Sequence, residues 1–321
     1  MKGKVLTLLR ENEHTFLSGE KISRELNCSR TAVWKQINSL RNEGFDIVAT
    51  QNKGYQLIKG GRDLSEHNLI SRIKGNGLFH KVVYYPSVSS TQTIANQLVN
   101  EGDSEGIVVV ADEQTDGKGR LGRPWQSQKQ SGISMSLVLK PDIDFRQAPQ
   151  LTLVSAVAVT RALRERTGLS IDIKWPNDLL VNGKKLAGIL TEMQVDPDRI
   201  QSVIIGIGIN VNHDNFPDEL TSIATSLKVE SGEEFDRADL IGEILREFSW
   251  LYETYLSKGF SFIKPLWEAH SLSIGKVITA RRARDSVEGE VIGINDEGVL
   301  LLKDNQGETH HIYSADIDIK S

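Results

Sequence analysis

The sequence has a single cysteine, Cys28, among its 321 residues, so a disulfide within the chain is excluded. A chain of this kind suits a reducing compartment. No apolar run approaches the roughly 18 residues that a membrane-spanning helix needs, and the N-terminal segment lacks the apolar core of a signal peptide. We therefore expect a cytoplasmic protein that does not enter a membrane.

Two common nucleotide-binding loops are also missing, although one segment looks like them. Gly117, Gly119 and Gly122 form a G-x-G-x-x-G pattern after a β-branched segment, residues 106–111. A dinucleotide-binding fold would need a helix directly after the glycines, and a Walker A loop would need Lys followed by Ser or Thr. An Arg-Pro-Trp sequence follows instead. The run still offers backbone N–H groups and three cations to an anion, although a solvated surface loop would look the same.

The histidines give little support for a metal centre. His310 and His311 are neighbours on an expected strand, so their side chains face opposite sides. No second histidine cluster accompanies them. We therefore predict no metal site at this pair.

The composition is ordinary for a protein with a packed core, at 39% hydrophobic and 25% charged residues. The length predicts two or three domains. The net charge of −5 hides an asymmetry, because residues 1–62 hold 11 Lys and Arg against 6 Asp and Glu, whereas the remainder holds 27 against 37. A small basic module on an acidic body predicts that the module binds a polyanion.

The basic module has the periodicity of helices followed by a hairpin. Apolar spacing predicts helices over residues 4–11, from Ser18, and from Ser29 to Gly44, and two short strands flank an Asn-Lys-Gly turn. This order describes a winged helix-turn-helix, although a small protein-binding domain would show the same elements. The residues expected to contact DNA are Ser29, Arg30, Thr31, Lys35, Gln36 and Lys53.

Residues 63–270 combine hairpin strands and helices without a regular βαβ alternation, which favours an α+β fold. Glycines weaken a strand, so Gly206 and Gly208 indicate close approach of a ligand or of another backbone. The expected strands cover residues 81–85, 107–111, 132–139, 171–175, 179–181, 185–190 and 203–211, and the expected helices cover 65–70, 93–101, 148–167 and 237–256.

Three segments of this region carry polar side chains that a core does not need. Residues 174–178 place a cation, an indole, a proline, an amide and a carboxylate in succession. Ser90 and Thr91 precede a helix, where they either bind a polar ligand or cap the helix. Lys185 lies in an apolar strand, where its ammonium either reaches water or faces an acid substrate and phosphate. Together with the glycine run, these segments predict a site for a nucleotide and an acid.

Residues 271–321 change to short strands separated by turns. The expected strands cover residues 276–280, 288–293, 298–302 and 310–313. This pattern predicts a small SH3-like β-barrel as a third domain.

The ordered set of these segments resembles the family of bifunctional biotin–protein ligases and biotin-operon repressors over essentially the whole chain. The resemblance implies a central mixed α/β domain of the biotin/lipoate protein ligase type. No single motif is decisive, but the order and spacing are highly specific. The matching segments are the winged helix, Ser90-Thr91, Gln114, residues 117–125, 174–178, 185–190 and 206–210, and the small β-domain.

The resemblance implies an ATP- and Mg²⁺-dependent ligase. Such an enzyme forms biotinyl-5′-AMP from biotin and ATP, then transfers biotin to a lysine on the carrier domain of a carboxylase. Because carboxylate and α-phosphate repel each other, a cationic loop is needed to bring them in line. By this resemblance Lys185, Arg120 and Arg123 are catalytic, Arg120 retains the adenylate, and Asp178 is a candidate Mg²⁺ ligand.

The resemblance also divides the site into two halves. One departure is Lys118, where many relatives carry arginine; the swap matters little if only the backbone touches biotin. The expected biotin half is Ser90, Thr91, Gln92, Gln114, Lys118, Gly119, Arg120, Lys185, Gly188 and Gly206, and the expected nucleotide half is Gly117, Arg123, Trp125, Lys174, Asn177, Asp178 and Asn210.

The resemblance further implies a regulatory cycle. The adenylate acts as corepressor by ordering the glycine loop, the body forms a homodimer, and two winged helices then span a palindromic operator. The sequence itself shows no dimer surface.

Three other functions remain open on the sequence. A pure transcription factor would sense a small acid without ATP turnover, and the retained Lys185 and Arg120 argue against it. A lipoate-type ligase shares the chemistry but usually lacks a DNA-binding module. A ligase with a vestigial N-terminal domain is disfavoured by the exposed cations expected at Arg30 and Lys35.

Overall fold

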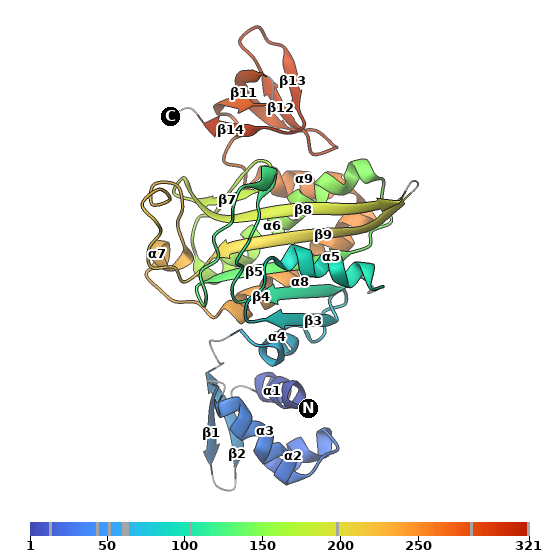
Figure 1. Cartoon of the computed structure of the whole chain (residues 1–321), viewed down its shortest axis with the longest axis vertical. Helices are drawn as coiled ribbons and strands as arrows, with labels where there is room; N and C mark the ends of the chain where they lie inside the picture. Colours follow the sequence, from blue (N-terminus) through green and yellow to red (C-terminus); the bar gives the residue numbers. More distant parts are fainter. Residues whose placement is uncertain are drawn as a thin grey trace.

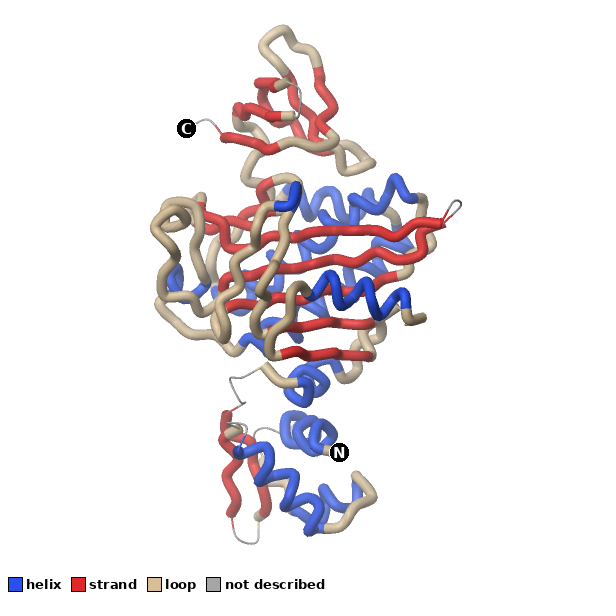
Figure 2. Tube along the Cα trace, viewed as in Figure 1, coloured by secondary structure: helices blue, strands red, loops and turns tan. Residues whose placement is uncertain are grey.

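The computed structural model describes residues 1–12, 15–42, 45–50, 53–59, 64–102, 105–196, 199–282 and 285–319. Three units follow one another along the long axis of the molecule (Figure 1). A helical unit with a two-stranded ribbon lies at one end, a broad helix-covered sheet lies in the middle, and a small sheet lies at the other end (Figure 2). The predicted boundary at residues 62 and 63 lies outside the described residues.

Two helices of the N-terminal unit, α2 and α3, begin directly after the predicted serines. Ser18 Oγ accepts a hydrogen bond from Lys21 N at 3.0 Å, and Ser29 Oγ accepts one from Ala32 N at 3.1 Å. These bonds satisfy backbone donors that a helix start leaves free. The elements are α1 (Lys2–Glu11), α2 (Gly19–Glu25), α3 (Arg30–Asn42), β1 (Asp46–Thr50) and β2 (Gly54–Lys59).

A separate hydrophobic cluster, which includes Val5, Ile22 and Ile37, fills the space between these helices and the ribbon. The apolar spacing in the sequence therefore corresponds to one buried face on each helix. The predicted winged helix-turn-helix is confirmed. Gly44, the expected end of the third helix, lies outside the described residues.

Seven strands form the central sheet in the order β3-β4-β5-β9-β8-β7-β6. β3 and β4 are parallel, and every other neighbouring pair is antiparallel. β4 and β5 are buried along their whole length, which explains their continuous apolar sequences. The α+β prediction is confirmed. The strands are β3 (Lys81–Tyr85), β4 (Ile107–Ala111), β5 (Gly132–Leu139), β6 (Asp172–Lys174), β7 (Asp178–Val181), β8 (Lys184–Asp196) and β9 (Arg199–Asn210).

Helices cover both faces of this sheet, with α6 and α8 packed together on one face and α5 on the other (Figure 1). α4 contacts both α1 and α8, so it joins the N-terminal unit to the central unit. Neither α7, a single short turn, nor α9, which contains Pro265, was predicted. No helix among the described residues is long and apolar enough to cross a membrane. The helices are α4 (Glu66–Ile73), α5 (Thr91–Asn100), α6 (Ala148–Thr167), α7 (Leu227–Ser231), α8 (Arg237–Lys258) and α9 (Phe260–Glu268).

The C-terminal unit is a five-stranded antiparallel sheet in the order β13-β12-β11-β10-β14. The pairing among the described residues leaves β13 and β14 at the two ends, so these strands do not close the expected barrel. β14 was not predicted, because its isoleucines alternate with aspartates over only four residues. Ile278 and Ile317 join the hydrophobic core of the central unit. The strands are β10 (Val277–Arg281), β11 (Ser286–Ile294), β12 (Leu300–Lys303), β13 (Thr309–Ile312) and β14 (Asp316–Ile319).

Candidate functional site

A cavity of about 520 Å³ collects most of the predicted ligand residues. It lies against β5, β8 and β9, and residues of β10 and β14 complete its wall. Gly117 and Asn210 were predicted to bind the nucleotide, but they are not part of this wall. The predicted residues in the wall are Ser90, Thr91, Gln92, Gln114, Lys118, Gly119, Arg120, Arg123, Trp125, Lys174, Asn177, Asp178, Lys185, Gly188 and Gly206.

One end of the cavity is a chain of neutral hydrogen-bonding groups. Gln114 Oε1 accepts hydrogen bonds from Thr91 N at 2.8 Å and from Thr91 Oγ1 at 3.1 Å. Ser136 Oγ, fully buried on β5, donates to Thr91 Oγ1 at 2.8 Å. Ser90 precedes α5, but its side chain makes no capping hydrogen bond. The hydroxyl-rich segment is therefore more than a helix cap, and the sequence analysis missed Ser136.

Gln92 extends this neutral end toward β8 and β9. Its Nε2 donates to Glu192 Oε2 at 3.0 Å, and its side chain lies where a Cβ on Gly206 would stand, within 3.1 Å. The glycine thus makes room for an amide side chain. The expected close approach at Gly206 is present, and the Gln92 side chain makes it.

The glycine loop is held by its own backbone. Gly119 N donates to Arg123 O and Trp125 N donates to Gly117 O, both at 2.8 Å. Two of the N–H groups that we expected to face an anion are therefore used within the loop. Leu121 adopts a positive φ of 57° and is 78% exposed, so the tip turns tightly with an apolar side chain in solvent.

Trp125 returns from this loop onto the sheet. A Cβ on Gly208 would lie 2.4 Å from its indole, so only glycine lets the ring pack there. Lys185 Nζ lies 5.7 Å from the centroid of the same ring. The indole is therefore a flat wall beside a cation, which suits stacking with a planar base.

Lys185 Nζ also lies 2.6 Å from Asp178 Oδ1, and the lysine side chain is 37% exposed. Its ammonium is therefore directed at the cavity wall. Lys184, its neighbour on β8, instead donates to Thr221 O at 3.0 Å. Asp178 presents a carboxylate in the same wall, and one carboxylate together with substrate phosphates is a set of oxygen ligands that Mg²⁺ accepts.

The two loop arginines contact the C-terminal unit. Arg120 donates to Asn177 Oδ1 at 3.3 Å and to Ser314 Oγ at 3.0 Å, and burial lowers its pKa. Arg123 forms an ion pair with Asp316; their hydrogen bond raises the pKa of Arg123 and lowers that of Asp316. Asp316 and its neighbour Asp318 are wall residues that the sequence analysis missed.

The amides at the nucleotide end are anchored to backbone oxygens. Asn177 Nδ2 donates to Ile189 O at 2.8 Å, and Asn210 Nδ2 donates to Thr225 O at 3.0 Å. Trp175 is buried and its Nε1 donates to Gly298 O at 3.3 Å, so this indole joins the central unit to the C-terminal unit. The Trp175–Pro176 peptide bond is cis.

The outer face of α3 presents three of the six predicted DNA-binding side chains. Arg30, Thr31 and Lys35 are exposed, and residues of α2, α3 and the ribbon line a surface hollow of about 680 Å³. Trp34 lines the same hollow, is 53% exposed and was not predicted. Ser29 acts as the helix cap described above, so its hydroxyl is already engaged. Lys53 is exposed just before the ribbon's second strand, with Nζ 5.9 Å from the centroid of the Phe16 ring.

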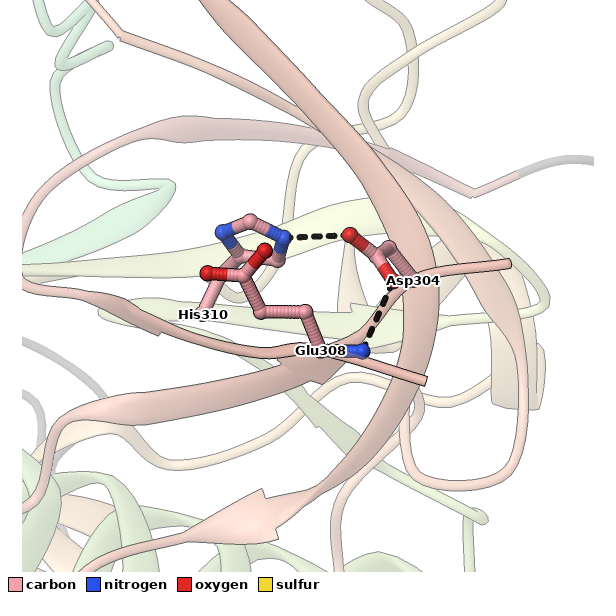
Figure 3. Close-up of side chains that lie close together, drawn as sticks. All are labelled: Asp304, Glu308 and His310. Carbon is pink, nitrogen blue, oxygen red and sulfur yellow. Dashed lines mark hydrogen bonds and ion pairs between the residues drawn. The ribbon is translucent and has the colours of Figure 1, made fainter. Parts of the chain in front are cut away.

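One cluster of possible metal ligands stands apart from the cavity, and Figure 3 shows its three side chains, Asp304, Glu308 and His310. His310 Nε2 lies 2.7 Å from Asp304 Oδ2, and this hydrogen bond lowers the pKa of Asp304. Asp304 Oδ1 accepts hydrogen bonds from the backbone N–H groups of Gln306 and Glu308, each at 2.9 Å. Both carboxylate oxygens therefore stabilise the turn between β12 and β13.

Three protein families match successive parts of this chain. The biotin/lipoate A/B protein ligase family matches residues 84–210, an HTH domain family matches residues 3–56, and the biotin protein ligase C-terminal domain matches residues 273–320. The bifunctional ligase/repressor BirA of Bacillus subtilis is 49% identical over 99% of this chain and 98% of its own length. The bifunctional ligase/repressor BirA of Escherichia coli is 28% identical over 94% and 91%.

A solved structure supports the same assignment. The biotin protein ligase from Aquifex aeolicus, in complex with biotin and ATP, superposes with a TM-score of 0.67. It is 32% identical and covers 75% of this chain and 99% of its own. On the near full-length match to the Bacillus protein, this chain belongs to the BirA family of bifunctional biotin–protein ligases and repressors.

Proposed function

We propose that this protein is an ATP-dependent biotin–protein ligase. It forms biotinyl-5′-AMP from biotin and ATP and transfers biotin to a lysine on the carrier domain of a carboxylase. One observation carries the proposal: a single cavity has a neutral hydrogen-bonding end at Thr91 and Gln114 and a charged end at Lys185 and Asp178. A bicyclic urea needs the first end, and a carboxylate meeting a phosphate needs the second.

In the first step a biotin carboxylate oxygen attacks the α-phosphorus, and the bond to pyrophosphate breaks. Both reactants are anionic, so their encounter costs electrostatic energy in a partly dehydrated site. Lys185 offsets that repulsion because its ammonium stands in the wall at the charged end of the cavity, beside Asp178. Trp125 provides a flat surface for the base. Asp178 would hold Mg²⁺ together with the triphosphate, and the ion would supply charge neutralisation there.

In the second step the neutral amine of the carrier lysine attacks the acyl carbon, and AMP leaves with the phosphate oxygen. The adenylate must survive until the carrier arrives. Arg120, fixed to Asn177 and Ser314, lies in the cavity wall and limits escape of the adenylate. Arg123, paired with Asp316, connects the loop to the C-terminal unit, so that unit is part of the site.

We propose that the ligand residues divide into the two halves that the family resemblance implies. Asn210 and Gly117 lie outside the wall, and Gly117 O accepts a hydrogen bond from Trp125 N. The biotin half comprises Ser90, Thr91, Gln92, Gln114, Lys118, Gly119, Arg120, Lys185, Gly188 and Gly206, and the nucleotide half comprises Gly117, Arg123, Trp125, Lys174, Asn177, Asp178 and Asn210.

We further propose that the adenylate-loaded protein is a homodimer that represses its operator. The DNA-binding domain is residues 1–62, the ligase domain is residues 63–270, and the β-domain is residues 271–321. The exposed cations of α3 support DNA binding. Dimerisation would place two such helices on the halves of a palindrome.

Biotin-dependent exchange of pyrophosphate into ATP tests the first half-reaction, with lipoate and octanoate as parallel acids. We expect exchange with biotin alone. Exchange with lipoate instead would move the protein to the lipoate-type ligases. Tight biotin binding without exchange would leave a sensor that only regulates transcription.

A further inference from the structure

Arg237 joins the two ends of the segment that carries the ligand loop. It is the first residue of α8, and its side chain is 3% exposed. Its Nη1 donates to Asp112 Oδ1 at 2.6 Å and to Gly132 O at 3.0 Å. Asp112 directly follows β4 and Gly132 begins β5. The guanidinium therefore binds the residue just before and the residue just after the segment 113–131.

We propose that Arg237 is a positioning residue for the ligase reaction. By holding both ends of residues 113–131, it fixes where Gln114 and the glycine loop stand against the substrate. The inference rests on the proposed function, because it deepens the account of how that cavity binds biotin.

Strand pairing alone does not require this buried ion pair. β4 and β5 already form a continuous antiparallel ladder, from the pair Ile107 and Val138 to the pair Ala111 and Ser134. Burying two charges costs free energy that well-packed apolar residues would avoid. What the ion pair adds lies beyond the ladder, where the chain leaves the sheet and becomes the loop.

Asp112, on the N-terminal side of the loop segment, is close in sequence to Gln114 at the neutral end of the cavity. Asp112 N donates to Tyr85 O at 3.1 Å, and Thr115 N donates to Val88 O at 2.9 Å. These bonds align residues 112–115 beside the segment that enters α5. Gln114, between them, is thereby brought to Thr91. A shift of Asp112 would move this amide relative to the hydroxyls that face biotin.

The second end leads to the nucleotide half. Gly132 pairs with Asn210 on β9, and Ser131 O accepts a hydrogen bond from Asn212 N at 2.6 Å. A Cβ on Gly132 would lie 3.0 Å from Ile209 O and 3.2 Å from His213 Cε1. The packing around Gly132 leaves little room for this residue to move. We therefore expect a change at Arg237 to shift the adjoining loop residues instead.

The experiment separates positioning from stability by replacing both charges at once. Removing Arg237 alone would leave Asp112 buried and uncompensated and would destabilise the fold. In the double variant Asp112→Leu/Arg237→Met we expect an apolar pair to fill the site and stability to be retained, but the hydrogen bond from Arg237 to Gly132 O is lost. We expect a KM for biotin raised about tenfold in the exchange reaction, an effect of about 1.4 kcal/mol, with kcat within about twofold.

Limited proteolysis of the ligand-free protein gives a readout that does not depend on catalysis. We expect cleavage within residues 113–131 to be several-fold faster in the double variant than in the wild type at equal melting temperature. This measurement remains informative if the wild-type protein shows no exchange. Failure of the proposed function and failure of the proposed role of Arg237 are therefore distinguishable.

Three variants complete the test. Arg237→Lys keeps a charge and several donors. We therefore expect its KM for biotin to stay close to the wild-type value. Arg237→Gln is neutral and shorter; if the double variant does not fold, it should raise KM at a temperature where it is folded. Glu243→Gln/Arg246→Gln removes an exposed ion pair on the same helix and should change neither readout. Wild-type KM and wild-type cleavage in folded double variant or Arg237→Gln would overturn the proposal.

Discussion

The N-terminal unit and the ligand cavity assemble their functional side chains in opposite ways. On the N-terminal unit, most of the candidate DNA contacts belong to one helix, α3, within eight residues of chain. The cavity wall draws on residues from Ser90 to Asp318. A surface made by one element follows from local periodicity, whereas a cavity made by many elements exists only when the whole body is folded.

The hydrophobic cores of these regions also differ in whether one unit or several units build them. The N-terminal unit has its own hydrophobic cluster, while one continuous cluster runs through the central and C-terminal units. The loop arginines reach the C-terminal unit as well. We therefore expect changes on α3 to leave the ligase intact, and changes in the cavity wall to depend on both larger units.

The largest effect should follow from Lys185→Ala. Loss of the ammonium leaves the repulsion between carboxylate and α-phosphate uncompensated, so we expect pyrophosphate exchange to fall by about 10²–10³-fold. Lys184→Ala is the matched control, because its Nζ donates to Thr221 O outside the cavity wall. Exchange at the wild-type rate in Lys185→Ala would remove this residue from the mechanism.

The next largest effect concerns only the N-terminal unit. Arg30→Ala/Lys35→Ala should weaken binding to operator DNA by about 10²-fold, since each lost base or phosphate contact contributes on the order of 1–3 kcal/mol. Fluorescence anisotropy at several salt concentrations measures the affinity for DNA. The slope of log affinity against log salt concentration should decrease in magnitude by about 0.9 per lost phosphate contact. Pyrophosphate exchange should not change. A parallel loss of exchange would contradict the separation of the two regions, and Glu20→Ala/Arg24→Ala on α2 is the control.

A smaller effect is expected from Arg120→Gly. The variant loses the contacts with Asn177 and Ser314, so we expect the adenylate to dissociate about tenfold faster and to label bystander lysines. Stopped-flow release of the adenylate and blotting for biotin on an added inert protein measure the two consequences. Arg146→Gly, which removes an exposed arginine outside the wall, is the control. Unchanged dissociation without stray labelling would reject the proposed role.

The smallest effect at neutral pH is expected at His213. Burial, reinforced by the nearby Arg237, lowers its pKa from 6.5 to about 4. Between these pH values the unfolded chain binds the extra proton, so stability falls as pH drops from about 6.5 toward 4, by about 2 kcal/mol at pH 5. Urea unfolding of His213→Leu at pH 7.5 and pH 5 should show a smaller acid loss than wild type. An equal loss in both proteins would assign it to other groups.

Much of the fold was accessible from local pattern. The strands around residues 107–111 and 132–139, and the helix ending at Gly168, agree with the structure because each has its own periodicity and end signal. Elements without such signals were missed: α7 is a single turn, α9 has an internal proline, and β14 alternates over four residues.

The site shows the same division. Lys185 and the loop arginines were recognisable because a cation in an apolar strand, or beside glycines, has few structural uses. Ser136 was not, because a hydroxyl within an apolar strand is common until Thr91 is found beside it. Asp316 lies almost two hundred residues from Arg123, and no local pattern connects them.

The sequence by itself determined the order of the elements, the basic winged helix and the chemistry of the side chains that the cavity would use, because charge and periodicity are properties of neighbours along the chain. Only the tertiary structure decided which of those side chains meet. Gly208 admits the Trp125 ring, Arg237 joins the ends of the loop, and the C-terminal unit supplies the partner of Arg123. Each of these contacts joins residues that are far apart in the sequence, and only the packing of the whole fold brings them together.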